Sequence, residues 1–562
     1  MISKLRAFHE KHPNVLPFLV VFALIFVRYC YYGFQYNYQL DDYIPYHNYV
    51  TSGFSLTELI NIHGMLSQRP LSWLFDVIIW ARFFDQMLVA VALISALYAA
   101  AALMLRRVFA RHFGCGSLFV VAMTLLPLGF EGTYWVAAST RVVVGMFFSA
   151  LSLYFFDAFL HSGGKRRIPA FVLAQVVAYG LYEQNLIFSF AATILIAVVT
   201  WFEKPANLDQ KLRRRRVALA GFTVLLVPAY FLFTASFPQN EAYVSRSQIG
   251  TPLTPGYLQD IFLPLLRQLK SVYLGGGVAT LTRGTTRALR LIAESPNILY
   301  IALILTLTAA VFLLANRKPE ANANAKARRP ILAITIGLML ALAPLAPFFI
   351  LYNPWFSFRG AVMTFPGFAL IADTLLALIL TRVRAKRAIT AAVTAAFTLI
   401  CCIAAVSELH DYKLTTERDM QITSAIAAIV AVGEETTRDS NIAVLNVSPT
   451  YLTDQNYYYH EHVHGVTESN WALTGMMEYR MSYMTRPKVT PLPAGEMYRQ
   501  WNSATSRLTN FDALYFYLDG AVYRVALTPA ANGKTAVTDA DSGRLLAHTW
   551  ETDNIGYLQL LT

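Results

Sequence analysis

Long apolar stretches alternate with short polar segments from the N-terminal region to about residue 406. Because a helix needs about 18 or more largely apolar residues to cross a bilayer, this pattern predicts about eleven membrane-spanning helices. We expect them near residues 15–33, 86–105, 117–130, 142–159, 168–182, 187–202, 217–237, 298–316, 331–350, 362–380 and 388–406. The first run begins near Val15, after a basic leader, and no small-residue cleavage site follows it. We therefore interpret it as an uncleaved first span rather than a signal peptide.

Basic residues cluster in every second segment between these apolar stretches. If the leader is cytoplasmic, the positive-inside rule requires each later inner loop to be basic as well. All five predicted inner loops are basic. They carry Arg106, Arg107 and Arg111; Lys165, Arg166 and Arg167; Arg213 to Arg216; Arg317, Lys318, Arg328 and Arg329; and Arg382, Arg384, Lys386 and Arg387. The N-terminus is thus predicted to be cytoplasmic, and an odd number of spans places the C-terminal tail outside.

The composition indicates a membrane protein, and the placement of the basic residues excludes a nucleic-acid-binding protein. Of the 562 residues, 56% are hydrophobic and only 14% are charged, whereas soluble domains carry roughly a quarter charged residues. The net charge of +12 could indicate a nucleic-acid partner. We exclude that class because the basic residues lie in short inter-span clusters, where they set topology and meet membrane lipids.

Two predicted outer loops are long, at residues 34–85 and 238–297. The first contains LSWLFDVIIWARFF, and the second contains YLQDIFLPLLRQLKSVYLGGG. Both segments are typical of helices lying in the membrane interface or re-entering it. The glycines at 275–277 are expected to break the second helix.

The polar tail predicts a separate domain. The fold prediction is an all-α polytopic membrane domain over residues 1–406 and a small extracytoplasmic α/β or α+β domain over residues 407–562. In the tail, ERDMQITSAIAAIVAVGEET resembles an amphipathic helix and NIAVLNVS a buried strand. ALYFYLDGAVYRVAL predicts a hairpin that turns at Asp519 and Gly520.

An acidic pair, Asp41 and Asp42, follows the first span in YNYQLDDYIPYHNYV. Carboxylates at a membrane surface between tyrosines can accept a proton from an attacking hydroxyl, or hold a divalent cation such as Mg²⁺ or Mn²⁺ against a phosphate. The competing interpretation is a helix cap or a solvated turn, because adjacent acids are common in loops.

Four more charged residues fall at predicted outer ends of spans. These are Glu131, Arg141, Glu183 and Arg359. Ionisable groups at membrane depth are costly, so they are candidates for function. The alternative is that each lies just outside the membrane, hydrated or paired, for example Glu131 with Arg141. Their gathering on the face that carries the acidic pair favours a shared polar site.

Arginines and histidines supply further candidates. Arg69, in SQRPLSW, can grip a phosphate with two hydrogen bonds, or it can be a surface residue before an interfacial helix. In YYYHEHVHG, the histidines at 460, 462 and 464 would share one face of a strand and could bind zinc. Such near neighbours rarely close a tetrahedral site, so an exposed strand or loop is the competing view. No nucleotide-binding or HExxH motif is present.

Together, the topology and these motifs resemble the GT-C superfamily of membrane glycosyltransferases. LDD at 40–42 and RPLSW at 69–73 resemble the first-loop pattern of bacterial GtrII-type O-antigen glucosyltransferases. TYWVAASTR and YGLYEQN are similar to membrane-embedded parts of such enzymes. The topological resemblance covers nearly the whole chain, the motifs cover about ten residues, and the tail resembles no domain that we can name.

The resemblance implies a glycosyltransferase of the bacterial inner membrane that builds lipopolysaccharide or another part of the cell envelope. It implies an inverting transfer from a polyprenyl-phosphate sugar donor to a glycan, lipid or protein acceptor outside the cytoplasm. Asp41 or Asp42 would then be the base. Arg69 and Arg359 are candidates for the donor phosphate. For Glu131, Arg141 and Glu183 we hypothesise, from their face and charge, that they orient the acceptor or hold a cation.

Three rival functions stay open at this stage. A lipid-linked glycan transporter or flippase would show repeat symmetry and charges near the bilayer midplane, and neither is seen in the sequence. An O-antigen polymerase or ligase would use arginines of a large outer loop, and Arg283, Arg287 and Arg290 keep that possibility open. An assembly protein without enzymatic activity would leave the acidic pair without a role.

Overall fold

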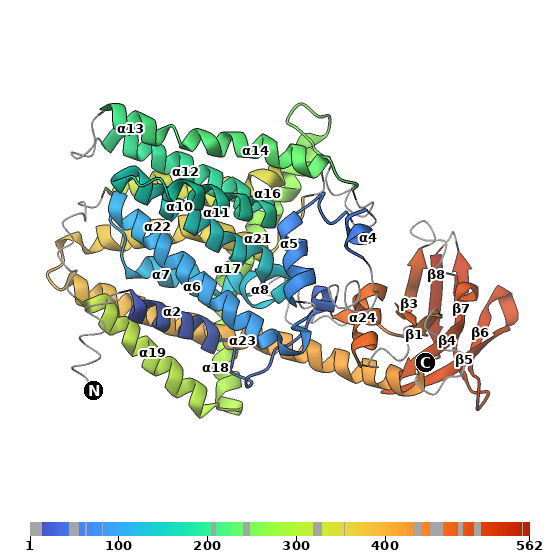
Figure 1. Cartoon of the computed structure of the whole chain (residues 1–562). Helices are drawn as coiled ribbons and strands as arrows, with labels where there is room; N and C mark the ends of the chain where they lie inside the picture. Colours follow the sequence, from blue (N-terminus) through green and yellow to red (C-terminus); the bar gives the residue numbers. More distant parts are fainter. Residues whose placement is uncertain are drawn as a thin grey trace. The chain divides into compact units, whose positions relative to one another are not determined.

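The computed structural model of the chain divides into two compact units (Figure 1). It describes residues 14–43, 55–61, 64–80, 82–203, 210–239, 248–317, 329–352, 354–430, 440–449, 465–480, 487–499, 507–552 and 555–561. Within these ranges, residues 14–36 and 55–409 form what we call the helical unit. Residues 37–43 and those from 410 onward form the C-terminal unit. Each unit is described by itself.

The helical unit consists of long apolar helices that run side by side (Figure 1). Over the described part of the chain, eight helices are long and apolar enough to cross a membrane. They span Phe84–His112, Val136–Ser162, Glu183–Glu203, Gln210–Ala235, Ile298–Asn316, Pro330–Phe349, Phe358–Arg382 and Lys386–Val430. A helix pair that meets the test jointly, α7 (Ser117–Leu125) with Pro127–Tyr134, is bent by 47° at Pro127, because proline cannot continue the hydrogen-bond ladder.

Two shorter apolar helices are α2 (Val15–Val27) and α11 (Arg167–Leu181). With them, each predicted span has a helical counterpart. Membrane embedding is also indicated by the surface, since α19 (Ile298–Asn316) exposes Leu299 and Leu313. An apolar helix face of this kind is unfavourable in water and suits lipid. The protein is therefore a mostly helical chain with the character of a membrane protein.

The helix that links the units differs from expectation. A span at 388–406 and a separate amphipathic helix from about residue 417 were predicted, but α23 runs without interruption from Lys386 to Val430. No glycine or proline occurs between its ends, so nothing in the backbone stops it. Its residues up to Leu409 belong to the helical unit, and those from His410 belong to the C-terminal unit.

The glycine triplet in the second long outer loop also behaves differently from the prediction. The helix α16 (Leu263–Lys270) passes through a π-helical turn, η9 (Ser271–Gly276), directly into α17 (Gly277–Leu281). The break expected at 275–277 is therefore wrong. A Cβ atom on Gly276 would overlap the ring of Phe358, so the missing side chain serves close packing between helices.

The C-terminal unit contains a mixed sheet in the order β2-β1-β4-β5-β6-β7-β8-β3. Its strands are β1 (Asn441–Leu445), β2 (Lys488–Leu492), β3 (Gly495–Arg499), β4 (Ala513–Leu518), β5 (Ala521–Pro529), β6 (Thr535–Asp539), β7 (Leu545–Thr552) and β8 (Ile555–Leu560). β1 pairs in parallel with β2 and β4, and the other pairings are antiparallel. The helix α24 (Asn470–Arg480) packs against β2, where the Thr474 hydroxyl accepts the Val489 N–H at 3.0 Å.

The two strand predictions for the tail are confirmed. Ile442 to Leu445 of β1 are completely buried, as the apolar NIAVLNVS pattern predicts. β4 and β5 form a hairpin in which Leu518 is paired with Ala521. Asp519 and Gly520 between them have φ values of 51° and 82°, as a two-residue hairpin turn requires. The histidines at 460, 462 and 464 lie outside the described residues.

Candidate functional site at the predicted outer helix ends

Arg69 and Glu183 form an ion pair between the first outer loop and the start of α12 (Glu183–Glu203). The Arg69 Nε lies 2.9 Å from each Glu183 carboxylate oxygen. The Arg69 guanidinium carbon also lies 4.5 Å from the ring centroid of Tyr182. The two charged side chains keep 28% and 35% of their surface exposed. The two side chains therefore have a fixed orientation, and a ligand can still reach them.

Arg69 holds an uncommon backbone conformation. Its φ and ψ are 49° and 52°, in the left-handed region, directly before α5 (Pro70–Phe75). A left-handed non-glycine residue costs about 1–3 kcal/mol, and such residues cluster at functional sites. Proline at the first helical position accounts for part of the geometry, because the residue before proline avoids the right-handed helical region.

A second arginine lies close to the same segment. Arg141 donates from Nε to the Ser72 hydroxyl at 2.9 Å, and its Nη2 lies 3.4 Å from the carboxylate of Asp76. The Asn185 amide donates to the Arg141 carbonyl at 2.7 Å. Asn185 is two residues from Glu183, so the two arginine pairs belong to one cluster. The pairing of Arg141 with Glu131, considered as an alternative from sequence, is replaced by the contact with Asp76.

Glu131 and Arg359 lie in an adjacent group. Glu131, on α8 (Phe130–Tyr134), is fully buried and accepts a hydrogen bond from the Ser357 hydroxyl at 3.1 Å. The Arg359 guanidinium carbon lies 5.6 Å from the Trp135 ring centroid. A Cβ on Gly132 would lie 3.0 Å from the Arg359 Cα, so glycine permits this close approach.

Gln184 joins the two groups. Its side-chain amide donates to the carbonyl oxygens of Gly360 at 3.0 Å and Pro344 at 3.1 Å. Gln184 follows Glu183 of the first group, and Gly360 follows Arg359 of the second. The structure thus brings together five residues that the sequence had singled out, which we call the outer cluster: Arg69, Glu131, Arg141, Glu183 and Arg359.

Asp41 and Asp42 belong to the C-terminal unit. They lie in a single 3₁₀ turn, η1 (Leu40–Asp42), where Asp42 is buried and its carboxylate accepts the Gln39 N–H at 3.0 Å. The helix-cap interpretation therefore describes Asp42. Asp41 is half-buried, so it is the more accessible acid of the two.

The turn with the acidic pair is fastened to the later part of α23. The Gln39 side chain donates to the Tyr412 carbonyl at 3.0 Å and the Thr416 hydroxyl at 2.9 Å. Beside it, burial and then the carboxylates of Asp419 and Asp42 raise the pKa of the Tyr43 phenol well above its ordinary value. Tyr43 therefore remains neutral and forms part of the wall beside the acids.

Sequence reasoning missed several participants. Asp76 was read only as part of an interfacial helix, although a lone acid in an apolar stretch is itself a signal. Asp419, whose carboxylate accepts the Val466 N–H at 2.9 Å, carried no such signal in a polar segment. Arg28, at the end of the first span, is fully buried and donates to the Thr133 hydroxyl at 3.0 Å.

The expected divalent cation has no ready-made ligand set in the outer cluster. Across the described ranges, the group of histidine and acidic residues close enough to hold a metal ion is His112, Asp157 and His161. This histidine and aspartate group lies at the helix ends opposite to those that carry the outer cluster. Glu183 is paired with Arg69, and this ion pair would compete with a cation at Glu183.

No protein-family model matches the chain, and no curated protein matches it either.

Proposed function

We propose that the protein is a membrane glycosyltransferase that takes its sugar from a polyprenyl-phosphate donor. The observation that carries the proposal is that two partly exposed arginines, Arg69 and Arg141, are each held by an ion pair at the predicted outer ends of apolar helices. A donor of this kind has an apolar tail and an anionic head. It therefore calls for cationic side chains at the boundary of an apolar unit.

The outer cluster suits transition-state stabilisation more than simple attraction. Glu183 fixes the plane of the Arg69 guanidinium, and Ser72 and Asp76 fix that of Arg141. Donors that are oriented before the substrate arrives stabilise developing charge without reorganisation. In glycosyl transfer, the charge develops on the departing phosphate, so preorganised arginines lower the barrier.

For the base, the geometry favours Asp41 over Asp42, because Asp42 is buried and caps its own turn. In the proposed step, Asp41 takes the proton of an acceptor hydroxyl. The hydroxyl oxygen forms a bond to the anomeric carbon, and the bond from that carbon to the phosphate oxygen breaks. Polyprenyl phosphate leaves with the electron pair, and the configuration at the anomeric carbon inverts.

The proposal is tested with the full chain in proteoliposomes. A panel of radiolabelled polyprenyl-phosphate hexoses is supplied together with a lipid and glycan extract of the cell envelope. We expect labelled product with one donor, lost in Asp41→Asn and strongly reduced in Arg69→Ala. Transfer that persists in both Asp41→Asn and Asp42→Asn would refute the mechanism.

One observation supports a different enzyme of the same lipid-linked class. The amphipathic helix α18 (Arg283–Glu294) exposes Arg283 and Arg290, whereas Arg287 donates to Ser407. A polymerase or ligase would rely on such outer-loop arginines. In the same assay, Arg290→Ala should leave transfer unchanged if the outer cluster binds the donor, and should abolish it if α18 does.

A further inference from the structure

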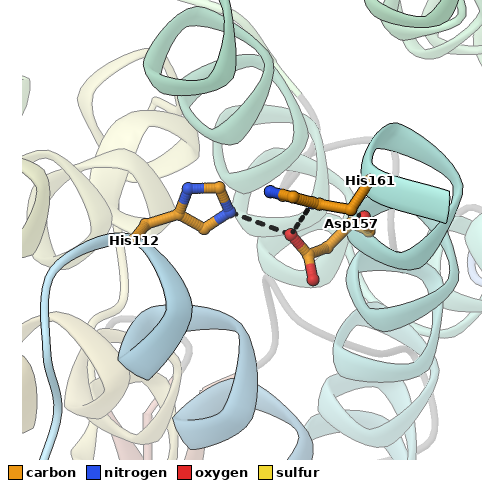
Figure 2. A group of neighbouring side chains, drawn as sticks. All are labelled: His112, Asp157 and His161. Atoms are coloured by element: carbon orange, nitrogen blue, oxygen red, sulfur yellow. Dashed lines mark hydrogen bonds and ion pairs between the residues drawn. The ribbon is translucent and has the colours of Figure 1, made fainter. Parts of the chain in front are cut away.

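Three helices of the helical unit meet at a buried polar group at their predicted cytoplasmic ends. His112 is the last residue of α6 (Met87–His112), and Asp157 and His161 lie on α10 (Gly145–Ser162). Glu203 ends α12. Figure 2 shows both imidazole rings directed at the carboxylate of Asp157. The outer cluster is at the other ends of these helices, so this group has no part in the proposed transfer.

The distances bring three ligand-type atoms together. His112 Nε2 lies 2.9 Å from Asp157 Oδ1, and His161 Nδ1 lies 3.2 Å from the same oxygen. One ligand atom from each of the three residues lies within 4.8 Å of the others. With metal–ligand bonds of about 2.0–2.2 Å, neighbouring ligands of a zinc ion lie about 3 Å apart. The two spacings to Asp157 therefore suit a metal site, and the 4.8 Å limit that covers all three atoms means that an ion would draw the ligands closer together.

A second carboxylate, that of Glu203, contacts the other ring nitrogen of His112. Its Nδ1 lies 3.1 Å from Glu203 Oε2, while Nε2 faces Asp157. Metal-binding histidines characteristically donate their second ring N–H to a carboxylate, which fixes the tautomer and the ring orientation. If the His112 Nδ1–H donates to Glu203, the lone pair of Nε2 faces a carboxylate oxygen. That arrangement is favourable only with a cation between the two atoms.

The cation between His112 and Asp157 can be a proton or a metal ion. His161 Nδ1 donates to the Asp157 carbonyl oxygen at 2.9 Å and also lies 3.2 Å from Oδ1. A metal ion would replace this hydrogen bond and use three ligands, whereas a proton joins only two atoms. Asp157 can accommodate this, because its other oxygen, Oδ2, pairs with Arg111. His112 and Asp157 are almost fully buried, so ligands at this site are shielded from competing water.

We propose that His112, Asp157 and His161 bind a divalent transition-metal ion of the zinc class, with Glu203 orienting His112. Metal binding displaces the proton between His112 and Asp157. The ion would join α6 and α10 directly and α12 through Glu203, as a structural clamp at one end of the helical unit. Three protein ligands leave a fourth position for water.

The test measures metal content in the purified full chain, carried without a histidine tag. The histidines at 460, 462 and 464 are replaced by glutamine in every sample, so that zinc bound there does not contribute. After treatment with a chelator, reloading with zinc and washing, elemental analysis should give about one zinc per chain. Cobalt in place of zinc should give the visible absorption of a low-symmetry site with nitrogen and oxygen ligands.

His161→Gln and Asp157→Asn should each reduce bound zinc at least tenfold. Glu203→Gln should weaken zinc affinity by about 10–100-fold, as loss of an orienting carboxylate does. The matched control is His548→Gln, on β7, which should bind like the parent. If Asp157→Asn does not fold, His161→Gln and Glu203→Gln decide the matter, because His161 is partly exposed. A parent that takes up no stoichiometric zinc overturns the proposal, as does zinc uptake that His161→Gln leaves intact.

Discussion

The Arg69 Nε lies 2.9 Å from both carboxylate oxygens of Glu183, although 114 positions separate the two residues. Through this pair, the first outer loop is attached to the start of α12. The same loop segment meets Arg141 through Ser72 and Asp76. The outer cluster therefore depends on a loop being held in place, and its charged contacts can be altered one at a time.

Arg69→Lys tests whether the guanidinium acts through its shape or its charge. Lysine keeps the positive charge but cannot make two parallel hydrogen bonds to a phosphate. We expect transfer in the proteoliposome assay to fall about 10–100-fold, since losing a charge-assisted hydrogen bond costs about 1.5–3 kcal/mol. Folding stability should change by less than about 1 kcal/mol, because the pair with Glu183 is partly exposed.

Glu183→Gln is the matched substitution of the partner of Arg69 in the ion pair. It retains the size of the side chain and one acceptor oxygen but removes the charge that orients Arg69. We expect a smaller loss of transfer than in Arg69→Lys, with thermal unfolding in detergent unchanged. Equal activity of Glu183→Gln and the parent would show that this ion pair does not matter for function.

Substitutions at the two neighbouring aspartates should differ in effect: one should abolish transfer, and the other should lower stability. Asp41→Asn should abolish transfer and leave the unfolding temperature unchanged, because its side chain is only half-buried. Asp42→Ala should cost about 1 kcal/mol of stability through loss of the cap on Gln39 N–H. Asp42→Asn, which keeps an acceptor oxygen, serves as the control. Differential scanning fluorimetry measures the unfolding temperatures, and the proteoliposome assay measures transfer. A loss of stability in Asp41→Asn alone would contradict this assignment.

Adjacent glycines in the second long outer loop should respond differently to the same change. A Cβ on Gly276 overlaps the buried ring of Phe358, whereas one on Gly277 meets its nearest atom, on Leu128, at 3.4 Å. We expect Gly276→Ala to destabilise the protein by about 1–3 kcal/mol, as overpacking does. Gly277→Ala should be neutral or stabilising by up to about 1 kcal/mol, because alanine is the better helix former. Unfolding temperatures of the two variants provide the comparison, and equal values would mean that η9 does not approach Phe358 this closely.

The sheet of the C-terminal unit should lose stability in acid through Asp539. Hydrogen bonds from the Ser542 hydroxyl and the Asp541 N–H lower the pKa of the Asp539 carboxyl below its ordinary value. A lowered pKa in the folded state means stability that is complete above the unfolded pKa of about 3.9 and is lost as pH falls through the folded pKa. Unfolding of the full chain, followed between pH 6 and pH 2, should show this loss.

Ser542→Ala is the control for the acid effect, since it removes the largest cause of the lowered pKa. In that variant the fall in stability should be shallower over the same pH range. A pH profile identical to that of the parent would show that Asp539 does not contribute.

A structural feature could be predicted from the sequence where the interactions that determine it lie among neighbouring residues. The hairpin at Asp519 and Gly520 follows from the positive φ that a two-residue turn needs, and glycine there signals it directly. Predictions that depended on a remote partner failed. The glycines at 275–277 looked like a helix break, because no sequence rule shows that Phe358 packs against Gly276. The length of α23 was underestimated for a related reason: a change of polarity looks like a helix end, but only the backbone or packing can impose one.

The sequence by itself determined the apolar helices, the alternation of basic loops, the hairpin and the helix ends at which charged residues fall. Each of these follows from burial or backbone preference within a few neighbouring residues. Only the tertiary structure decided which charges meet: Arg69 with Glu183, Arg141 with Asp76, and His112 with Asp157. Such pairs join residues far apart along the chain. A charge must find a partner when it leaves water, but the identity of that partner is set by how the helices pack.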